Sequence, residues 1–283
     1  MSMIAKLTRN ILDLVFPCAC VICGKADAEL CSSCQEKIVP NWQRVDAGAS
    51  YLTTPVPQES IVPNNFRLNL GGRSFPESDF RAIFPVYTPY RYRGTVKELI
   101  VSWKHTNLRD LERQILRLWD ADLRQLQQML AAADMDLRSL FPQLDCTREM
   151  IVVNAPSGFR RRYDGQLIAW KLALTLAAVF AAQPQDALRK KLHFKRSLSR
   201  FLRHLCTQQY AVANLSLRHE KIADSYAVLD LQGKQVLLVD DVLTTGATLL
   251  GSARAVTAAG GIVIGAICFA NAVFNENSCS KVL

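Results

Sequence analysis

The sequence predicts an α/β protein with a parallel sheet covered by helices on both faces, preceded by a small four-cysteine module. Short, largely apolar runs alternate along the chain with stretches of helical spacing, and this alternation is typical of parallel sheets buried on both sides. A second observation, five cysteines within the first forty residues, predicts the separate module. The 283 residues and 49% apolar composition fit a folded chain of one large or two smaller domains.

Two Cys-x-x-Cys pairs, Cys20 with Cys23 and Cys31 with Cys34, are separated by seven residues. Each pair places two thiolates on one tight turn, and together the turns supply the four sulfur ligands of a closed structural zinc site. We therefore expect these cysteines to bind Zn²⁺ with no open catalytic position. An iron–sulfur cluster is the remaining metal alternative. A redox pair is disfavoured, because no βαβ unit is predicted beside it.

The flanking segments divide the chain into three predicted parts. Upstream of the cysteines, apolar positions share one face of a short helix: Ile4, Leu7, Ile11 and Leu14. Downstream, Pro, Gly, Asn and Ser are frequent, as in a linker. We therefore predict an N-terminal helix and zinc module over 1–45, a linker or irregular segment over 46–80, and the α/β domain over 81–283.

Hydrophobic periodicity orders the elements of the α/β domain. Apolar side chains recurring every three or four residues predict helices, and short unbroken apolar runs predict buried strands. Pro85 lies inside the first run, so we expect that strand at an edge of the sheet. The predicted elements are a strand at 81–87, a short turn followed by a helix within 90–105, a helix at 107–133, a strand at 150–153, a helix at 167–182, a strand at 235–239, a helix at 248–259 and a strand at 262–269.

The net charge indicates the kind of partner that the protein binds, and the cysteine count indicates its compartment. A formal net charge of +9 favours an anionic partner such as nucleic acid or a phosphorylated metabolite. The longest strongly apolar stretch, 172–182, is too short to predict a membrane span, and the N-terminus lacks the pattern of a secretory signal. An odd number of cysteines, nine, argues for a reducing compartment. We expect a soluble, cytoplasmic protein.

The stretch from Val236 to Thr248 is the most informative. It predicts an apolar strand that ends in two carboxylates, a Thr/Gly loop, and then a helix. In open α/β sheets, ligands bind beyond the carboxyl ends of the strands. The loop offers backbone N–H groups, hydroxyls and a glycine at a helix N-terminus, which together suit a phosphate.

The two carboxylates, Asp240 and Asp241, would repel a phosphate, so their expected partners are hydroxyl groups or a cation. A ribose diol lies close to its own 5′-phosphate. The sequence therefore predicts a ribose-5-phosphate site, in which the carboxylates accept from the diol. The phosphate would be held by the loop residues Thr244, Thr245, Gly246, Ala247 and Thr248.

The string from Asp240 to Thr248 resembles the phosphoribosyl-pyrophosphate (PRPP) signature of type I phosphoribosyltransferases. The wider layout resembles the ComF competence-protein branch, also called the GntX group. Other matching features are Phe16-Pro17 before the cysteine pairs, Tyr92-Arg93-Gly94 leading to Lys104, the turn Arg160-Arg161-Arg162 reaching Gln166, and Thr207-x-Gln209 with Arg218.

This resemblance implies a type I phosphoribosyltransferase-like sheet that binds PRPP with Mg²⁺, and Asp240 and Asp241 as catalytic residues. It places Arg160, Arg161 and Arg162 where they would neutralise the leaving diphosphate, although a solvated basic turn is an alternative. It also implies a role in DNA uptake and natural competence, that is, in transformation. Single-stranded DNA and proteins of the competence machinery would then be partners.

A second basic segment, 189–204, interleaves Phe194 and Phe201 with Lys and Arg, as single-stranded nucleic-acid surfaces do. Its nucleic-acid candidates are Lys191, Lys195, Arg196, Arg200 and Arg203. By family position the segment could instead be a flap over PRPP, and a solvated basic helix is a further alternative.

Three functions remain open from the sequence. The first is a glycosyltransferase in which a nucleophile displaces pyrophosphate from C1′ of PRPP. The second is a non-catalytic protein that binds single-stranded DNA or a nucleotide in the same pocket, as a sensor or scaffold. The third, a zinc-dependent scaffold with a vestigial pocket, is disfavoured because the acidic pair and the Thr/Gly loop are both intact.

Overall fold

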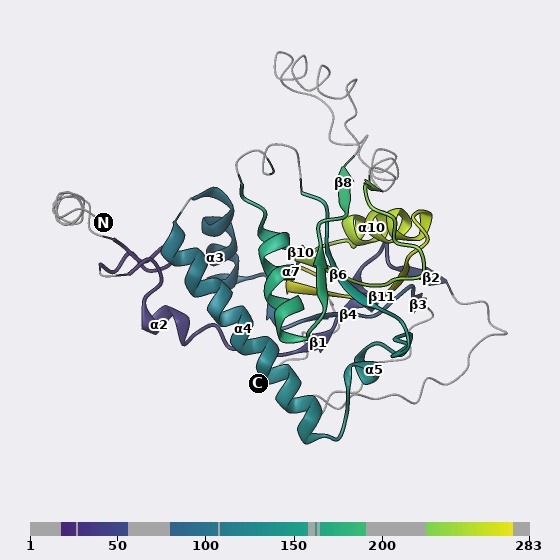
Figure 1. Ribbon diagram of the computed structural model, residues 1–283. Coiled ribbons are helices and arrows are strands. Elements are labelled where there is room, and N and C mark those ends of the chain that lie inside the picture. Colours follow the sequence, from purple (N-terminus) through teal and green to yellow (C-terminus); the bar gives the residue numbers. More distant parts are fainter. Residues whose placement is uncertain are drawn as a thin grey trace, which may run out of the picture.

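A computed structural model describes residues 18–26, 28–55, 80–106, 108–157, 162, 165–190 and 225–273. The predicted N-terminal helix and most of the predicted linker lie outside the described residues. Within them, the predicted fold class is confirmed: a mainly parallel sheet with helices on both faces, and a cluster of four cysteines near the N-terminus (Figure 1).

The central sheet has the order β1-β4-β11-β10-β6-β7, with β5 pairing to β11. All neighbours are parallel except β1 and β4, which are antiparallel. The strands are β1 (Gln43–Arg44), β4 (Val86–Thr88), β5 (Tyr90–Arg91), β6 (Met150–Asn154), β7 (Gln183–Gln185), β10 (Gln235–Leu243) and β11 (Ile262–Asn271). Strand β10 thus lies at the centre, between β6 and β11.

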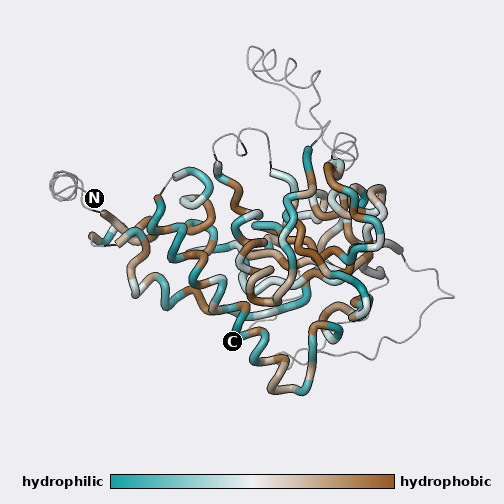
Figure 2. The backbone as a smooth tube through the Cα atoms, viewed as in Figure 1, coloured by the Kyte–Doolittle hydropathy of each residue, from teal (hydrophilic) through white to brown (hydrophobic). Residues whose placement is uncertain are grey.

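Helices cover the sheet on both sides. One face packs against α3 (Gly94–His105), α4 (Arg109–Ala132) and α7 (Ile168–Val179), and the other against α10 (Ala247–Ala258). Alternation along β10 divides the core accordingly: Leu237 and Val239 join the first cluster, and Val236 and Leu238 the second. Figure 2 shows the apolar segments gathered at the centre, with hydrophilic residues along the outer side of α4.

The remaining elements are short. They are α2 (Ser32–Gln35), the 3-10 turn η1 (Asp46–Gly48), α5 (Leu137–Leu140), and two antiparallel strand pairs, β2 (Thr53–Pro55) with β3 (Phe80–Ala82) and β8 (Leu188–Lys190) with β9 (Ser225–Ala227).

Two sequence-based predictions about strands were wrong. The single edge strand predicted at 81–87 is two strands, β3 and β4, and β4 is internal, between β1 and β11. Pro85 directly precedes β4, so its missing N–H does not interrupt the hydrogen-bond ladder. Strand β10 continues four residues beyond its predicted end at Val239, because β11 pairs with it as far as Leu243 and Asn271.

A buried polar pair joins the sheet to the longest helix. The Tyr90 hydroxyl in β5 donates a hydrogen bond to Asp122 in α4, which is only 5% exposed. Burial raises the pKa of Asp122 to about 6, although the Tyr90 hydrogen bond acts to lower it. An unfolded Asp has a pKa of about 3.9, so the folded state binds this proton more tightly than the unfolded state does. The resulting contribution to the free energy of unfolding is fully present below about pH 3.9. This contribution is lost as the pH rises through the folded-state value.

We predict that Tyr90→Phe lowers the free energy of unfolding by about 1–3 kcal/mol at pH 7.5, where the buried carboxylate loses its donor. At pH 5 the loss is smaller, because Asp122 can take up a proton. Urea unfolding at both pH values measures the difference. Tyr226→Phe, at a tyrosine that is 43% exposed, is the matched control. An equal loss at both pH values would contradict the assignment.

Candidate functional site

Three of the predicted ribose-phosphate residues, Asp240, Asp241 and Thr248, meet at the C-terminal ends of β6 and β10. A cavity of about 150 Å³ opens there, and residues 244–247 do not line it. Thr244 and Thr248 are exposed and Thr245 is partly exposed, so the predicted loop is not sealed beneath packing side chains. The cavity is lined by Ala155, Pro156 and Ser157 after β6, by Gln166, Ile168 and Ala169 at the start of α7, and by Lys190, Asp240, Asp241, Val242 and Thr248.

The two carboxylates lie inside β10 rather than beyond it. Strand pairing with β11 fixes their backbone, since Asp240 pairs with Cys268 and Val242 with Ala270. Asp241 forms an ion pair with Lys104 at the end of α3, with 2.7 Å between Nζ and Oδ2 and each side chain 16% exposed. This pairing balances the charge of Asp241.

Asp240 is the group whose titration the site changes most clearly. Burial, and then the negative charge of Asp241, raise its pKa to about 8, while Lys104 and Lys190 act to lower it. At neutral pH the Asp240 carboxyl therefore favours its protonated form. With Asp241 paired to Lys104, the acidic pair repels a neighbouring phosphate much less than two free carboxylates would.

The Thr/Gly loop is held in place from the segment 49–52. Gly246 has φ +81°, and a Cβ there would lie 2.6 Å from the Leu52 Cγ. The backbone N–H of Tyr51 donates to the Thr245 carbonyl at 3.0 Å. Helix α10 then begins at Ala247, so the loop presents its backbone at a helix N-terminus, as the sequence predicted.

Upstream, the same segment is fixed to the sheet by a buried carboxylate. Asp46 is 3% exposed and accepts from the Val86 backbone N–H at 3.1 Å and from Arg44. The sequence did not predict the supporting role of Tyr51 and Leu52, because the composition of the surrounding segment, 46–80, indicates only a linker or irregular structure. Their function depends on a contact about two hundred residues away along the chain.

Sequence reasoning also missed two lysines at the site. Lys104 enters the sequence-based prediction only through the family resemblance. It lies four residues after the buried Ile100 and so shares its helix face. Lys190 belongs to the predicted basic segment 189–204 and is not among the candidates predicted there, yet it lines the cavity from the end of β8.

The structure describes one residue of the predicted arginine turn, Arg162, and none of the predicted nucleic-acid residues. Arg160, Arg161, Lys191, Lys195, Arg196, Arg200 and Arg203 lie outside the described residues. Arg162 forms a two-pronged ion pair with Asp186, at 2.7 and 2.8 Å. Burial is the largest single influence on the pKa of Asp186 and acts to raise it. The hydrogen bonds and charge of Arg162, the charge of Arg189 and a hydrogen bond from Asn154 together outweigh burial, so the pKa is lowered.

The four predicted zinc ligands come together. The Sγ atoms of Cys20, Cys23, Cys31 and Cys34 all lie within 4.8 Å of one another. Tetrahedral Zn²⁺ with Zn–S bonds of about 2.3 Å places its sulfurs about 3.8 Å apart, so this set fits the metal. The cluster is also tied to the main body, because Glu29 accepts a hydrogen bond from the Leu111 N–H at the start of α4.

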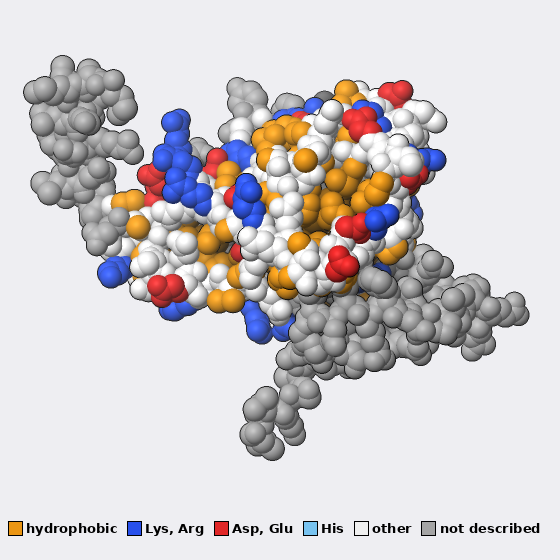
Figure 3. All heavy atoms as spheres, turned by 60° about the horizontal axis from the view of Figure 1, so that its bottom comes forward, with side chains coloured by type: hydrophobic (Ala, Val, Ile, Leu, Met, Phe, Trp, Pro, Cys, Tyr) orange, Lys and Arg blue, Asp and Glu red, His pale blue; other side chains and the backbone are white. Residues whose placement is uncertain are grey.

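Two further observations concern possible partners. Among the described residues, no helix combines the length and apolarity that a membrane crossing requires. On the face shown in Figure 3, Lys and Arg side chains are scattered between acidic and apolar ones rather than gathered into one patch. The described part of this face therefore offers no concentrated basic surface.

Comparison with known proteins points to one family for the C-terminal part. Residues 207–279 match the model of the phosphoribosyl transferase domain. A segment of 40 residues is 48% identical to orotate phosphoribosyltransferase of Pyrobaculum islandicum. The aligned segment makes up 14% of this chain and 21% of that protein. The chain thus matches about a fifth of this curated relative. Residues 207–279, which include the acidic pair and the Thr/Gly loop, are phosphoribosyltransferase-like.

Two solved structures are similar over about half of the chain. Adenine phosphoribosyltransferase from Thermoanaerobacter pseudethanolicus matches at 20% identity and a TM-score of 0.27, over 54% of this chain and 72% of that one. Adenine phosphoribosyltransferase from Leishmania tarentolae matches at 13% identity and a TM-score of 0.26, over 56% and 76%.

We predict that Gly246→Ala lowers the free energy of unfolding by about 2–4 kcal/mol, through left-handed backbone strain and the clash with Leu52. Gly233→Ala is the matched control, because Gly233 has φ +71° but no atom within 4 Å of the place a Cβ would take. It should lose only about 1–2 kcal/mol. In a Leu52→Ala background the cost of Gly246→Ala should shrink. Chemical denaturation of the wild type, the three single variants and the double variant measures these costs. Equal costs in both backgrounds would exclude the contact.

We also predict that the purified chain carries about one zinc ion and that Cys34→Ser loses it. Because the cysteine cluster contacts α4, the melting temperature should then fall by at least about 5 °C. Elemental analysis and thermal unfolding measure both effects. Cys146→Ser, at an exposed cysteine outside the cluster, should change neither. Zinc retained by the Cys34 variant, or iron in the wild type, would contradict the site.

Proposed function

We propose that the protein binds PRPP with Mg²⁺ at the ends of β6 and β10 and transfers its phosphoribosyl group to an acceptor. The observation that carries this proposal is the cavity at the C-terminal end of β10, which is lined by Asp240, Asp241 and Thr248. All three residues belong to the phosphoribosyltransferase-like segment. The activity named for the curated relative, an orotate phosphoribosyltransferase, is of the same reaction class.

Different residues of the site would bind different groups of PRPP. The N-terminus of α10 and its Thr/Gly loop, 244–248, would hold the 5′-phosphate through N–H groups and hydroxyls. Asp240 and Asp241 would accept hydrogen bonds from the ribose diol, with Lys104 keeping Asp241 in position. Lys190 adds a positive charge at the cavity. When bound, Mg²⁺ would supply positive charge to the diphosphate.

The proposed reaction is a substitution at C1′ of the ribose. A nucleophilic atom of the acceptor forms a bond to C1′ while the bond from C1′ to the diphosphate oxygen breaks. The electron pair of that bond leaves with diphosphate, and the acceptor loses its proton to solvent. The diphosphate role of Arg160, Arg161 and Arg162 stays a prediction, because Arg162 is paired with Asp186 and the other two lie outside the described residues.

A second candidate is binding without turnover, with single-stranded DNA or a nucleotide as the ligand. The net charge of +9 and the position of Lys190 at the cavity favour it. Pyrophosphate release on adding PRPP and an acceptor distinguishes the two functions. The role in DNA uptake and natural competence, the competence-protein partners and the cytoplasmic location stay predictions.

We predict that Mg-PRPP binding gives measurable heat in titration calorimetry. At about pH 8.5, where the Asp240 carboxyl is largely ionised, Asp240→Asn should weaken binding by at least about tenfold. Asp230→Asn, at an exposed turn before β10, is the control. No heat with the wild type, or equal affinity in Asp240→Asn, would overturn the proposal.

The same titrations carry a pH signature. Because the pKa of Asp240 is raised to about 8, the ionised acceptor form becomes more populated as the pH rises. Wild-type affinity should therefore increase from about pH 6.5 to about 8.5 by more than it does in Asp240→Asn. The variant accounts for titration of the phosphates of PRPP themselves.

A further inference from the structure

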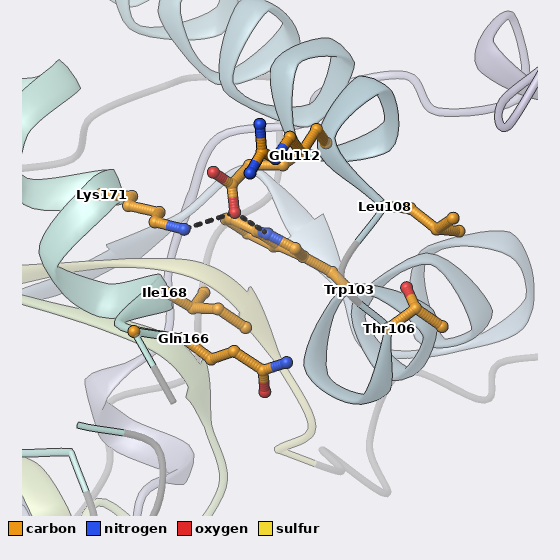
Figure 4. A pocket seen from close by; sticks show the side chains of 9 residues that line it. Trp103, Thr106, Leu108, Glu112, Gln166, Ile168 and Lys171 are labelled. Atoms are coloured by element: carbon orange, nitrogen blue, oxygen red, sulfur yellow. Dashed lines mark hydrogen bonds and ion pairs between the residues drawn. The ribbon is translucent and has the colours of Figure 1, made fainter. Parts of the chain in front are cut away.

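Glu112 lies where three helices meet, beside a second and larger cavity. This cavity measures about 380 Å³ and lies between the end of α3, the first turns of α4 and the start of α7. Figure 4 shows the Glu112 carboxylate between Lys171 of α7 and Trp103 of α3. Its Oε2 atom accepts from Lys171 Nζ at 2.5 Å and from the Trp103 indole N–H at 3.2 Å. One carboxylate of α4 therefore joins the ends of all three helices.

These contacts hold the last turn of α3. Trp103 is only 3% exposed, and its ring packs on Phe269 of β11 with 6.4 Å between the ring centroids. Because an indole has a single N–H donor, the bond to Glu112 sets the orientation of the ring. Lys104 is the next residue, and its Nζ pairs with Asp241 at the smaller cavity, which we propose binds PRPP. A shift of Trp103 would therefore move Lys104 relative to Asp241.

The first turn of α4 is itself held from the cysteine cluster. The N-cap residue of α4, Leu108, has an apolar side chain and makes no side-chain cap hydrogen bond. Glu29 supplies an acceptor instead, since its carboxylate accepts from the N–H of Leu111, which directly precedes Glu112. Its negative charge also lies at the positive end of the helix dipole. Glu29 lies between the two cysteine pairs, and its carbonyl accepts from the Val21 N–H at 3.0 Å.

We infer that Glu29 and Glu112 are positioning residues for the proposed phosphoribosyl site, because together they hold Lys104 against Asp241. Glu29 fixes the start of α4 to the cysteine cluster, and Glu112 fixes the end of α3 to the start of α4. The inference rests on the proposed function, since it concerns the affinity of that site for PRPP. Neither glutamate lines the smaller cavity, so both act through other residues.

Replacement of the Trp103 indole tests the connection between α4 and α3. Trp103→Phe keeps an aromatic ring beside Phe269 and deletes the N–H that Glu112 accepts. We expect the Mg-PRPP affinity of the full chain, measured by titration calorimetry, to fall by at least about fivefold, because Lys104 is no longer held in place.

Trp119→Phe is the matched control. The Trp119 indole donates to the Leu172 carbonyl at 3.1 Å, and so joins α4 to α7 through a buried bond that does not involve Glu112. The free energy of unfolding should fall in both tryptophan variants, since each loses a buried hydrogen bond. The Mg-PRPP affinity should change by less than about twofold in Trp119→Phe.

Each glutamate is tested by two further variants. Glu29→Ala and Glu112→Ala remove the acceptor, and each should lower the Mg-PRPP affinity by at least about threefold. Glu29→Gln and Glu112→Gln keep an oxygen that accepts from the same N–H, and should bind Mg-PRPP more tightly than the alanine variants. Glu36→Ala, at an exposed residue near the cysteine cluster, and Asp120→Ala, at an exposed ion pair with Arg124 in α4, are controls and should leave the affinity unchanged.

The pH dependence of binding separates positioning from a general loss of structure. The groups that face Asp240 are Asp241 beside it, Lys104 of α3, Lys190 of β8 and the buried Cys268 thiol of β11. Lys104 acts to lower the pKa of Asp240, so its displacement should raise that pKa further. The increase in Mg-PRPP affinity with pH should therefore move to higher pH in Trp103→Phe, but not in Trp119→Phe.

The outcomes distinguish this inference from the proposed function. Wild-type binding of Mg-PRPP that weakens in Trp103→Phe and in both alanine variants, with the shifted pH dependence, supports both. Wild-type binding that these variants leave unchanged, or that Trp119→Phe weakens equally, overturns the positioning role alone. An unshifted pH dependence in Trp103→Phe also overturns it. No binding of Mg-PRPP by the wild type overturns the proposed function and the positioning role together.

Discussion

Burial of strand β10 on both faces is the constraint on which the rest of the structure depends. The side chains from Val236 to Val239 are fully buried, so unpaired polar side chains are tolerated only near the ends of the strand. Pairing with β11 extends the strand to Leu243 and thereby fixes the backbone of the acidic pair. The Thr/Gly loop and α10 follow at once, which brings carboxylates, hydroxyls and a helix N-terminus together at one edge.

An acidic pair beside a loop that is proposed to bind phosphate raises an electrostatic conflict, and the tertiary structure reduces it in two ways. Lys104, from the end of α3, neutralises Asp241 through an ion pair, and burial favours the protonated form of Asp240. Lys190, at the end of β8, adds a positive charge at the cavity. The site can therefore accept an anionic ligand at the loop and still offer oxygen acceptors for hydroxyl groups.

The two cavities and the cysteine cluster are linked through the same helices. Ile168, the first residue of α7, and Gln166, two residues before it, line both cavities. Helix α4 carries Glu112 in its first turn. That turn is held from the cysteine cluster, because Glu29 accepts from the Leu111 N–H and Leu30 packs in the same core as Trp119. A metal bound by the cysteines would thus stabilise the wall of the larger cavity without taking part in chemistry.

Local sequence determined the fold class, the cysteine cluster, the long helix α4 and the position of the Thr/Gly loop after a buried strand. Those features follow from periodicity and from the properties of particular residues, which act over short distances along the chain. Tertiary structure alone decided that β4 is internal, that Tyr51 and Leu52 hold the loop, and that Lys104, Lys190 and the Glu112–Lys171 pair line or support the cavities. These contacts join residues far apart in the sequence, so no local pattern encodes them, and they arise only when separate elements pack together.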